Sequence, residues 1–213
     1  MNQAGNSTNE FDAKAAEWDN NPMHWERSKA ITEEMKRRFK LNNRLKALEF
    51  GAGTGIASFL LRDFVKEITL IDNSSEMVGV IKEKIKASKV TNLTVLNFDL
   101  EHNDMNGDVR YDLIFTQMVL HHVVDVEAII NKFGRMLNSG GHLAIADLYG
   151  EDGSFHGEGF TGHNGFDPAY LSEVLKKYKF RDITYNSCFI IDREISETET
   201  RKYPVFLLTA NRY

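Results

Sequence analysis

The sequence predicts an α/β fold in which helices cover both faces of one mostly parallel sheet. Two observations carry this prediction. From Leu45 onward, short apolar runs alternate with longer amphipathic segments, and a glycine-rich turn directly follows the first apolar run. Consecutive parallel strands need crossover connections, which amphipathic helices supply in a right-handed sense. The chain has 213 residues, enough for one such domain, and we treat residues 1–213 as a single domain.

The N-terminal part of the chain lacks this alternation. Residues 1–10 are polar and rich in asparagine, so we expect a loose end. Over residues 11–40 the apolar residues recur at helical spacing and Pro22 interrupts them, which predicts two helices. We expect residues 11–43 to form a helical lid and residues 44–213 to form the α/β core. The main apolar anchors of the lid are Trp18, Trp25, Ile31, Met35 and Phe39.

The core elements follow from the same pattern. Strands are predicted for five apolar runs: 46–50, 67–72, 93–98, 112–117 and 142–147. Helices are predicted between them: 55–64, 75–87 and 125–137. Ser74 and Ser75 are candidate N-caps of the second of these helices. After a further helix near 168–178, the strand-like runs 182–191 and 205–210 are separated by a charged stretch without a helical pattern, which predicts an antiparallel final pair.

Composition excludes several classes of protein. Apolar residues make up 42% of the chain and charged residues 27%, as in ordinary globular domains. The formal net charge of -5 offers no global field for a polyanion, so we expect no nucleic acid partner. The single cysteine, Cys188, cannot form an internal disulfide. With no apolar run of 18 residues and no signal-peptide pattern at the start, we expect a cytoplasmic protein with no membrane association.

The glycine-rich turn lies in ALEFGAGTGIA, residues 47–57. A dinucleotide fingerprint would place its third glycine at Ile56, and a P-loop would need a lysine after Gly55, so both phosphate-binding motifs fit poorly. Glu49, two positions ahead of Gly51, would repel a pyrophosphate but suit a cationic ligand. The turn therefore predicts a nucleoside ligand that carries positive charge and no phosphates. A tight strand-to-helix turn without any ligand is the structural alternative.

Two further acids follow predicted strands. Asp72 ends the second strand, where a carboxylate can accept hydrogen bonds from both ribose hydroxyls. Asp99 ends the third strand and could accept from an adenine amine, while the backbone of Leu100 meets the ring edge. Each acid alone could instead cap a helix or face solvent in a loop.

Five motifs in this order resemble the class I S-adenosylmethionine-dependent methyltransferases, in particular the small-molecule type similar to ubiquinone/menaquinone-type methylases. The matching segments are LEFGAGTG (48–55), LIDNSSEM (70–77), NFDLE (97–101), YDLIFTQMVLHHV (111–123) and MLNSGGHLAIAD (136–147). The resemblance implies a Rossmann-like, seven-stranded sheet with a reversed last strand. It also implies S-adenosylmethionine as cofactor and S-adenosylhomocysteine as product. The residues that would hold the cofactor are Glu49, Gly51, Ala52, Gly53, Gly55, Asp72, Asn73, Met77, Asp99, Leu100, Thr116 and Gln117.

Histidines are the candidates for proton removal from a methyl acceptor. His121 and His122 follow the fourth strand, and His163 lies in the glycine-rich stretch 150–167, which could form a loop over the acceptor. Hydrogen bonding of an imidazole to loop backbone is the structural alternative. His156, also in this stretch, could contact substrate, and the spacing of these residues defines no metal site.

These observations predict an enzyme that transfers a methyl group in line to a small-molecule acceptor. Three alternatives remain open: a methyltransferase of protein or RNA, a nicotinamide-dependent oxidoreductase, and a cofactor-binding protein without catalytic activity. The second is disfavoured by the glycine spacing and by Glu49. The sequence predicts neither the acceptor nor the oligomeric state.

Overall fold

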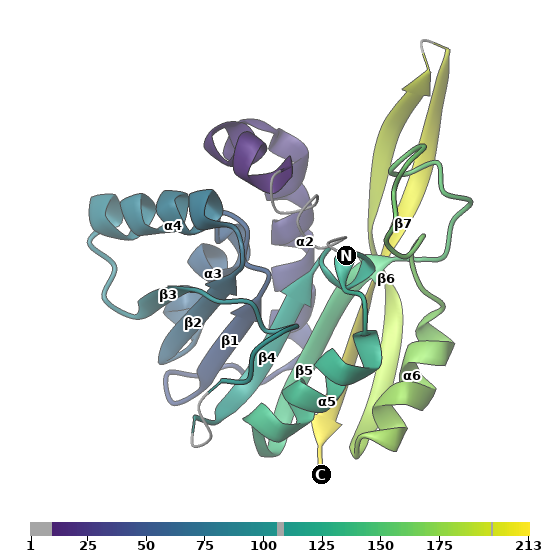
Figure 1. The fold of residues 1–213 in the computed structure, drawn as a ribbon. Coiled ribbons are helices and arrows are strands. Elements are labelled where there is room, and N and C mark those ends of the chain that lie inside the picture. The colour runs from purple at the N-terminus through teal and green to yellow at the C-terminus, as the bar shows by residue number, and fades with distance from the viewer. Residues whose placement is uncertain (1–9, 106–108, 197) are drawn as a thin grey trace.

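A seven-stranded sheet crosses the computed structural model, which describes residues 10–105, 109–196 and 198–213 (Figure 1). The strands lie in the order β3-β2-β1-β4-β5-β7-β6. All neighbours pair in parallel except at β7, which is antiparallel to both β5 and β6. The predicted sheet with its reversed last strand is thereby confirmed. The strand bounds are β1 Lys46–Phe50, β2 Glu67–Asp72, β3 Leu93–Asn97, β4 Tyr111–Gln117, β5 Leu137–Leu148, β6 Phe180–Ser196 and β7 Glu199–Arg212.

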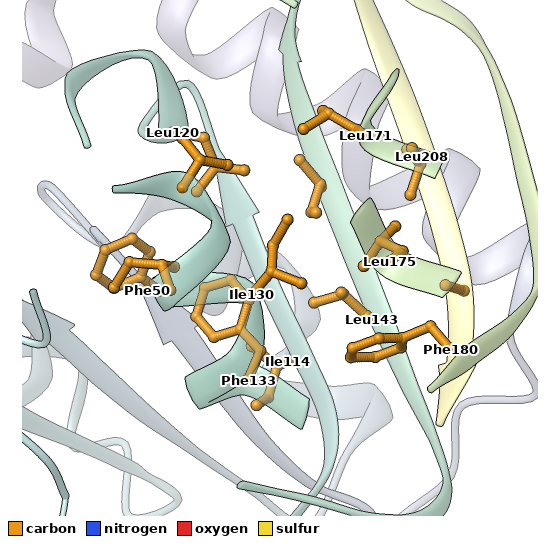
Figure 2. Close-up of a cluster of buried hydrophobic side chains, with 14 of the residues drawn as sticks. Phe50, Ile114, Leu120, Ile130, Phe133, Leu143, Leu171, Leu175, Phe180 and Leu208 are labelled. Atoms are coloured by element: carbon orange, nitrogen blue, oxygen red, sulfur yellow. The ribbon is translucent and has the colours of Figure 1, made fainter. Parts of the chain in front are cut away.

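Helices cover both faces of this sheet. Their bounds are η1 Ala15–Asn20, α2 Pro22–Arg38, α3 Ile56–Leu61, η2 Arg62–Phe64, α4 Ser75–Ser88, η3 Leu120–His122, α5 Val126–Met136 and α6 Pro168–Lys177. One hydrophobic cluster joins the sheet to α2, α3 and α4, and a second joins its other face to α5 and α6. Figure 2 shows the second cluster, where Ile130 and Phe133 of α5 and Leu175 of α6 meet strand residues. No helix in the described ranges is long and apolar enough to cross a membrane.

Local sequence signals fix where the core helices begin. The Ser74 side chain accepts a hydrogen bond from the Met77 amide and caps α4, as predicted. Asp125 and Asp167 cap α5 and α6 in the same way. These caps satisfy amide groups at the helix starts that have no intrahelical acceptor.

The last two strands are longer than the sequence predicts. β6 and β7 pair with each other as far as Ser196 and Glu199, whereas β7 pairs with β5 only over residues 205–211. Residues 190–196 and 198–204 therefore form a two-stranded arm that projects beyond the sheet (Figure 1). The charged stretch that suggested a break lies within this arm. A two-stranded ribbon satisfies its own backbone hydrogen bonds and can expose charged side chains on its faces, so it needs no apolar pattern.

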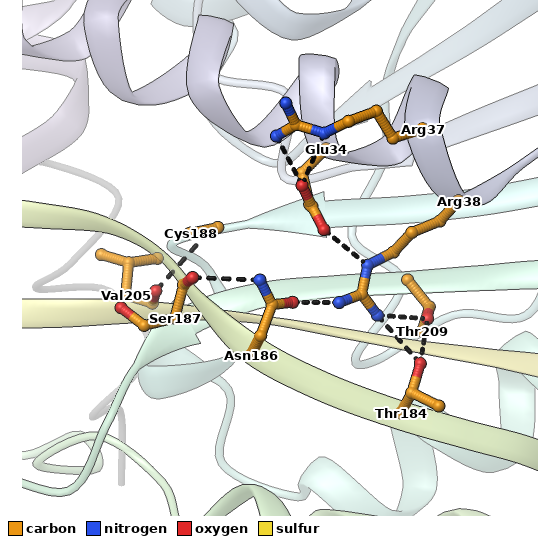
Figure 3. Close-up of polar contacts among 9 residues, drawn as sticks. All are labelled: Glu34, Arg37, Arg38, Thr184, Asn186, Ser187, Cys188, Val205 and Thr209. Carbon is orange, nitrogen blue, oxygen red and sulfur yellow. Dashed lines mark hydrogen bonds and ion pairs between the residues drawn. The ribbon is translucent and has the colours of Figure 1, made fainter.

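The N-terminal helices are anchored to the sheet at the end of α2. Arg38 donates to Thr184 on β6 at 2.9 Å and to Thr209 on β7 at 3.2 Å, and it also contacts Asn186 (Figure 3). Glu34, one turn earlier in α2, holds the same guanidinium at 2.9 Å. This network fixes α2 against the antiparallel part of the sheet.

Candidate active site

A cavity of about 1110 Å³ opens at the carboxyl ends of β1, β2 and β4, where ligands bind in sheets of this kind. Its walls come from the glycine loop, the loops after β2, β3 and β4, the N-terminal helices, the 149–167 loop and the β6–β7 arm. Most of the predicted site residues line it: Gly51, Ala52, Gly53, Asp72, Asn73, Met77, Asp99, Leu100, Gln117, His121 and His122.

Four predicted site residues lie outside the cavity wall: Glu49, Gly55, Thr116 and His163. Glu49 differs most from expectation. It is fully buried, accepts a hydrogen bond from the Ser58 hydroxyl at 2.5 Å, and leaves its Oε1 without a partner. Burial raises the pKa of Glu49 to about 8, so the side chain is largely neutral at pH 7. The expected negative charge at the mouth of the loop is therefore corrected to a buried, mostly protonated acid.

Hydrogen bonds attach the glycine loop to the end of β2. The amides of Gly51 and Ala52 donate to the Ile71 carbonyl at 2.9 and 3.1 Å, and the Gly53 amide donates to Asp72 Oδ2 at 2.7 Å. Gly51 has φ +66°, and a Cβ there would lie 2.4 Å from a methyl group of Val119. A larger residue at position 51 would therefore push apart two loops of the cavity wall.

The two predicted nucleoside acids are already engaged within the protein. Asp72 also accepts from the Ser74 amide, and burial raises its pKa despite these bonds. Asp99 accepts from the Glu101 amide and from His102. Although burial raises the pKa of Asp99, the hydrogen bonds from His102 outweigh it and lower the pKa overall. Both acids bond to groups of their own loops, as in the structural alternative, and both also lie on the cavity wall. Each carboxylate oxygen can still accept a further hydrogen bond.

The N-terminal segment is tied across the cavity entrance. Asp19 accepts from the Thr54 hydroxyl of the glycine loop at 2.5 Å and from Lys84 of α4 at 2.7 Å. Asp12 accepts from the Ser74 hydroxyl at 2.5 Å. The segment expected to act as a lid thus contacts both loops that form the nucleoside side of the cavity.

A cluster of histidines forms the far side. His121 Nδ1 donates to the buried Asp147 at 2.6 Å. His122 and His156 lie against it, and the His156 ring stacks on Phe160 with centroids 3.8 Å apart. Burial, reinforced by the neighbouring histidines, lowers the pKa of His122 to about 3 and that of His156 to about 4. Both rings are therefore neutral at pH 7, and such weakly basic nitrogens are poor general bases.

His163 has a structural position. Its Nε2 donates to the Val123 carbonyl at 3.0 Å, and its amide donates to the His121 carbonyl at 2.8 Å. A Cβ on neighbouring Gly162 would lie 2.2 Å from the same His121 carbonyl, so this close approach needs glycine. These contacts hold the 149–167 loop against the loop after β4, and the His163 imidazole binds backbone as in the structural alternative.

Comparison with known proteins agrees with this geometry. Residues 48–145, which contain the glycine loop, the acidic loops and the strands beneath them, match the family described as methyltransferase domain. The match covers 98 of the 213 residues, so this segment is similar to that family. The resemblance to class I S-adenosylmethionine-dependent methyltransferases is confirmed.

Relatives of the methyltransferase domain show how far the likeness extends. An uncharacterized methyltransferase of Schizosaccharomyces pombe is 29% identical over 144 residues, which cover 61% of this chain and 51% of that protein. The chain thus spans about half the length of this relative. The structure of the N-methyltransferase NodS from Bradyrhizobium japonicum, in complex with S-adenosylhomocysteine, superposes with a TM-score of 0.73 at 18% identity, covering 97% of this chain and 98% of that one.

A second solved structure has a similar fold and was determined with a partner protein. It belongs to a complex between the Trm112 methyltransferase activator of Haloferax volcanii and a methyltransferase, with 21% identity, a TM-score of 0.73 and coverage of 95% and 97%. At these identities the likeness concerns the fold of the methyltransferase domain.

Two residues of the cavity region escaped the sequence analysis. Arg27 of α2 lines the cavity, is 7% exposed and forms no ion pair in the described part of the chain. Burial lowers its pKa to about 10, so it stays charged, and its Nε has no hydrogen-bond partner. Asp147 ends β5 and positions His121. An acid at the end of an apolar strand was a signal for Asp147, whereas Arg27 sits among the charged residues of an amphipathic helix and gives none.

Proposed function

We propose that this chain transfers the methyl group of S-adenosylmethionine to a small-molecule acceptor inside the 1110 Å³ cavity. One observation carries the proposal. The family's glycine loop, two nucleoside acids and a set of unpartnered buried polar atoms surround one space. That space exceeds the roughly 300–1,000 Å³ of a single-ligand pocket, which leaves room for a cofactor and an acceptor together.

The nucleoside end of the cofactor would lie over β2 and β3. Asp72 is positioned to accept from ribose hydroxyls, and Asn73 and Met77 flank it on the cavity wall. Asp99 and Leu100 stand at the end of β3, where an adenine would fit against the apolar side chain. These roles agree with the family resemblance and with the placement of each residue.

The methionine end would lie between α2 and β4. Arg27 brings a buried positive charge with an unpaired Nε, and Gln117 brings a buried Oε1 without a partner. A buried charge or polar atom left unpaired is costly, so both groups suit a ligand with complementary atoms. An amino-acid carboxylate would pair with Arg27 and its ammonium with Gln117, so the residues present fit this cofactor.

The acceptor would occupy the remaining space beside His121, His122 and His156, under Phe155 and the β6–β7 arm. When bound, the cofactor supplies a methyl group already activated by its sulfonium leaving group. The chain aligns the acceptor, and its N-terminal segment and 149–167 loop exclude water. Because His122 and His156 are neutral at pH 7, they can orient a protonated acceptor by accepting a hydrogen bond.

Isothermal titration with S-adenosylmethionine, S-adenosylhomocysteine and NAD tests the cofactor half of this proposal. We expect one equivalent of each adenosyl compound to bind and NAD not to bind at comparable concentration. A screen of small acceptors with methyl-labelled cofactor, run beside protein and RNA fractions, tests the acceptor half. Binding of NAD alone would refute the proposal, and label found only in a macromolecule would refute the small-molecule acceptor.

A further inference from the structure

Three histidines from two separate segments meet at the acceptor end of the cavity. His121 and His122 belong to η3, directly after β4, and His156 comes from the 149–167 loop. Each offers a ring nitrogen that lies within 4.8 Å of the others. Their ring centroids are 4.2 to 5.4 Å apart, yet no hydrogen bond joins any two of the three rings across the described residues.

The cluster contains a nitrogen that the protein itself leaves unsatisfied. His156 Nε2 is buried and has no hydrogen-bond partner. A buried polar atom without a partner costs roughly 1–3 kcal/mol. Phe155 and Phe160, which contact the His156 ring edge-on and by stacking, hold it in this position. His156 lines the cavity, so a ligand bound there can supply the partner that the described residues do not.

A buried carboxylate contacts His121 and orients its ring. Asp147 is fully buried and accepts from His121 Nδ1 at 2.6 Å, from the His121 amide at 3.3 Å and from the Leu148 amide at 2.8 Å. Because Nδ1 contacts Asp147, Nε2 is the ring nitrogen left for a metal ion. A carboxylate behind a histidine in this way is the usual support of a metal-binding imidazole.

We propose that His121, His122 and His156 bind one divalent transition-metal ion of the Zn²⁺ type, with the fourth position open to the cavity. Neutral imidazoles are preferred ligands of such ions, and three protein ligands with one open position is the arrangement of catalytic zinc sites. Tetrahedral Zn–N bonds of about 2.0–2.1 Å place ligand nitrogens about 3.4 Å apart. The three nitrogens lie within 4.8 Å of one another, so the proposed site requires them to approach by at most about 1.4 Å on metal binding.

The ion narrows the acceptor class of the proposed methyl transfer, and this step rests on that proposed function. The bound ion brings two positive charges to this end of the cavity, and the buried Asp147 behind His121 supplies one negative charge. A ligand that binds as an anion balances the charge. The acceptor is thus a thiol or hydroxyl compound that loses its proton to solvent on metal binding. Its freed electron pair would form the new bond to the methyl carbon as the bond from that carbon to the sulfonium sulfur breaks, with the electron pair of the broken bond staying on S-adenosylhomocysteine.

Metal titration of the whole chain, purified without a histidine tag and freed of metal by a chelator, tests the site. We expect one equivalent of Zn²⁺ by calorimetry. One equivalent of Co²⁺ should give the intense visible absorption of a tetrahedral site, and 2-mercaptoethanol should change that spectrum by entering the open position.

Variants assign the ligands. His121→Ala, His122→Ala and His156→Ala should each weaken Zn²⁺ binding at least 100-fold, and Asp147→Asn should weaken it about 10-fold or more, as removal of a supporting carboxylate does. His142→Gln is the matched control, because His142 pairs with Asn211 at the other end of β5 and should leave affinity unchanged. If a histidine-to-alanine variant fails to fold, His156→Gln in the 149–167 loop tests the same metal site.

Two results would overturn the metal site: no stoichiometric Zn²⁺ binding, or binding that none of the three histidine variants weakens. Failure of the open position to accept 2-mercaptoethanol would overturn the acceptor class. S-adenosylhomocysteine titration of the same metal-free protein separates these outcomes from the proposed function. If the cofactor binds and the metal does not, only the metal site is refuted. If the cofactor does not bind, the proposed methyl transfer is refuted.

Discussion

Asp72 holds the backbone of the glycine loop and also faces the cavity. Asp72→Ala should weaken binding of S-adenosylmethionine by roughly 10- to 100-fold, because it removes a charged acceptor of buried hydroxyl groups. Titration calorimetry measures the effect. Asp63→Ala is the control, since Asp63 is 79% exposed and pairs with neighbouring Arg62. Unchanged affinity in Asp72→Ala would contradict the assignment.

Arg27 offers a test in which affinity and stability should separate. Arg27→Met keeps most of the side-chain volume and removes a buried charge that forms no ion pair among the described residues. We expect cofactor affinity to fall roughly 10- to 100-fold, while the free energy of unfolding of the empty protein stays unchanged or rises. Calorimetry and urea denaturation measure the two quantities. A loss of stability at unchanged affinity would indicate a purely structural residue.

Glu49 makes stability depend on pH. Its pKa rises from 4.5 to about 8 on folding, so the folded state binds the proton more tightly than the unfolded state. The resulting stabilisation is complete below pH 4.5 and is lost as pH rises toward 8. Glu49→Gln cannot ionise, so it should match the parent near pH 4 and exceed it by roughly 2–4 kcal/mol at pH 7.

Urea denaturation of both proteins across this pH range measures the difference. A constant offset between them would show that Glu49 does not titrate as its burial requires.

The same residue shows what sequence can and cannot predict at this scale. The position of Glu49 beside the glycines was readable, but its burial depends on α3 packing over β1, and Ser58 of that helix supplies the partner. Asp72 and Asp99 lie on the cavity wall because Asp72 ends β2 and Asp99 lies two residues after β3. The order of residues along the chain predicts where a residue lies in the fold, and tertiary contacts decide what surrounds its side chain.

Among the elements, the N-terminal segment depends on a few polar contacts. Asp19 joins it to Thr54 and to Lys84. Asp19→Ala should raise the dissociation rate of S-adenosylhomocysteine about 10-fold, because the segment then separates more readily from the glycine loop. Stopped-flow displacement measures this rate. Glu33→Ala, which removes an exposed contact to Lys36 in α2, should leave it unchanged. Equal rates in both variants would show that the segment does not retain the ligand.

The arm formed by residues 190–196 and 198–204 is the part of the sheet that the hydrophobic pattern did not predict. The five parallel strands were predicted from their apolar runs, which reflect burial in all of them except the edge strand β3. The arm carries Asp192, Arg193 and Glu194 on the cavity wall. Its residues contact the cavity and solvent, so they do not show the apolar pattern of a buried strand. Its strand pairing comes from backbone bonds between β6 and β7, which no side-chain periodicity reports.

For the whole molecule, ligand binding should appear as thermal stability. At 100 times its dissociation constant, S-adenosylhomocysteine adds about 2.7 kcal/mol, which corresponds to roughly 5–10 °C for a protein of this size. Differential scanning calorimetry measures the shift. NAD at equal concentration should give none, and an equal shift with NAD would favour the oxidoreductase alternative.

The overall topology was predictable and the histidine cluster was not. Strand and helix alternation defines a parallel α/β sheet almost alone, and its ligand edge follows from the topology. His122 and His156 are 34 positions apart. They meet because the 149–167 loop folds back on the loop after β4 through backbone contacts such as the His163 amide to the His121 carbonyl. Nothing in the order of residues encodes that return.

The place of β7 in the sheet also affects synthesis of the chain. Because β7 lies between β5 and β6, β6 cannot join the sheet until the ribosome has released residues 199–212. Until then β5 presents an open edge of unpaired peptide groups beside an apolar surface. A nascent polypeptide stalled before β7 is therefore a substrate for chaperones that shield exposed strands, however well its first five strands have formed.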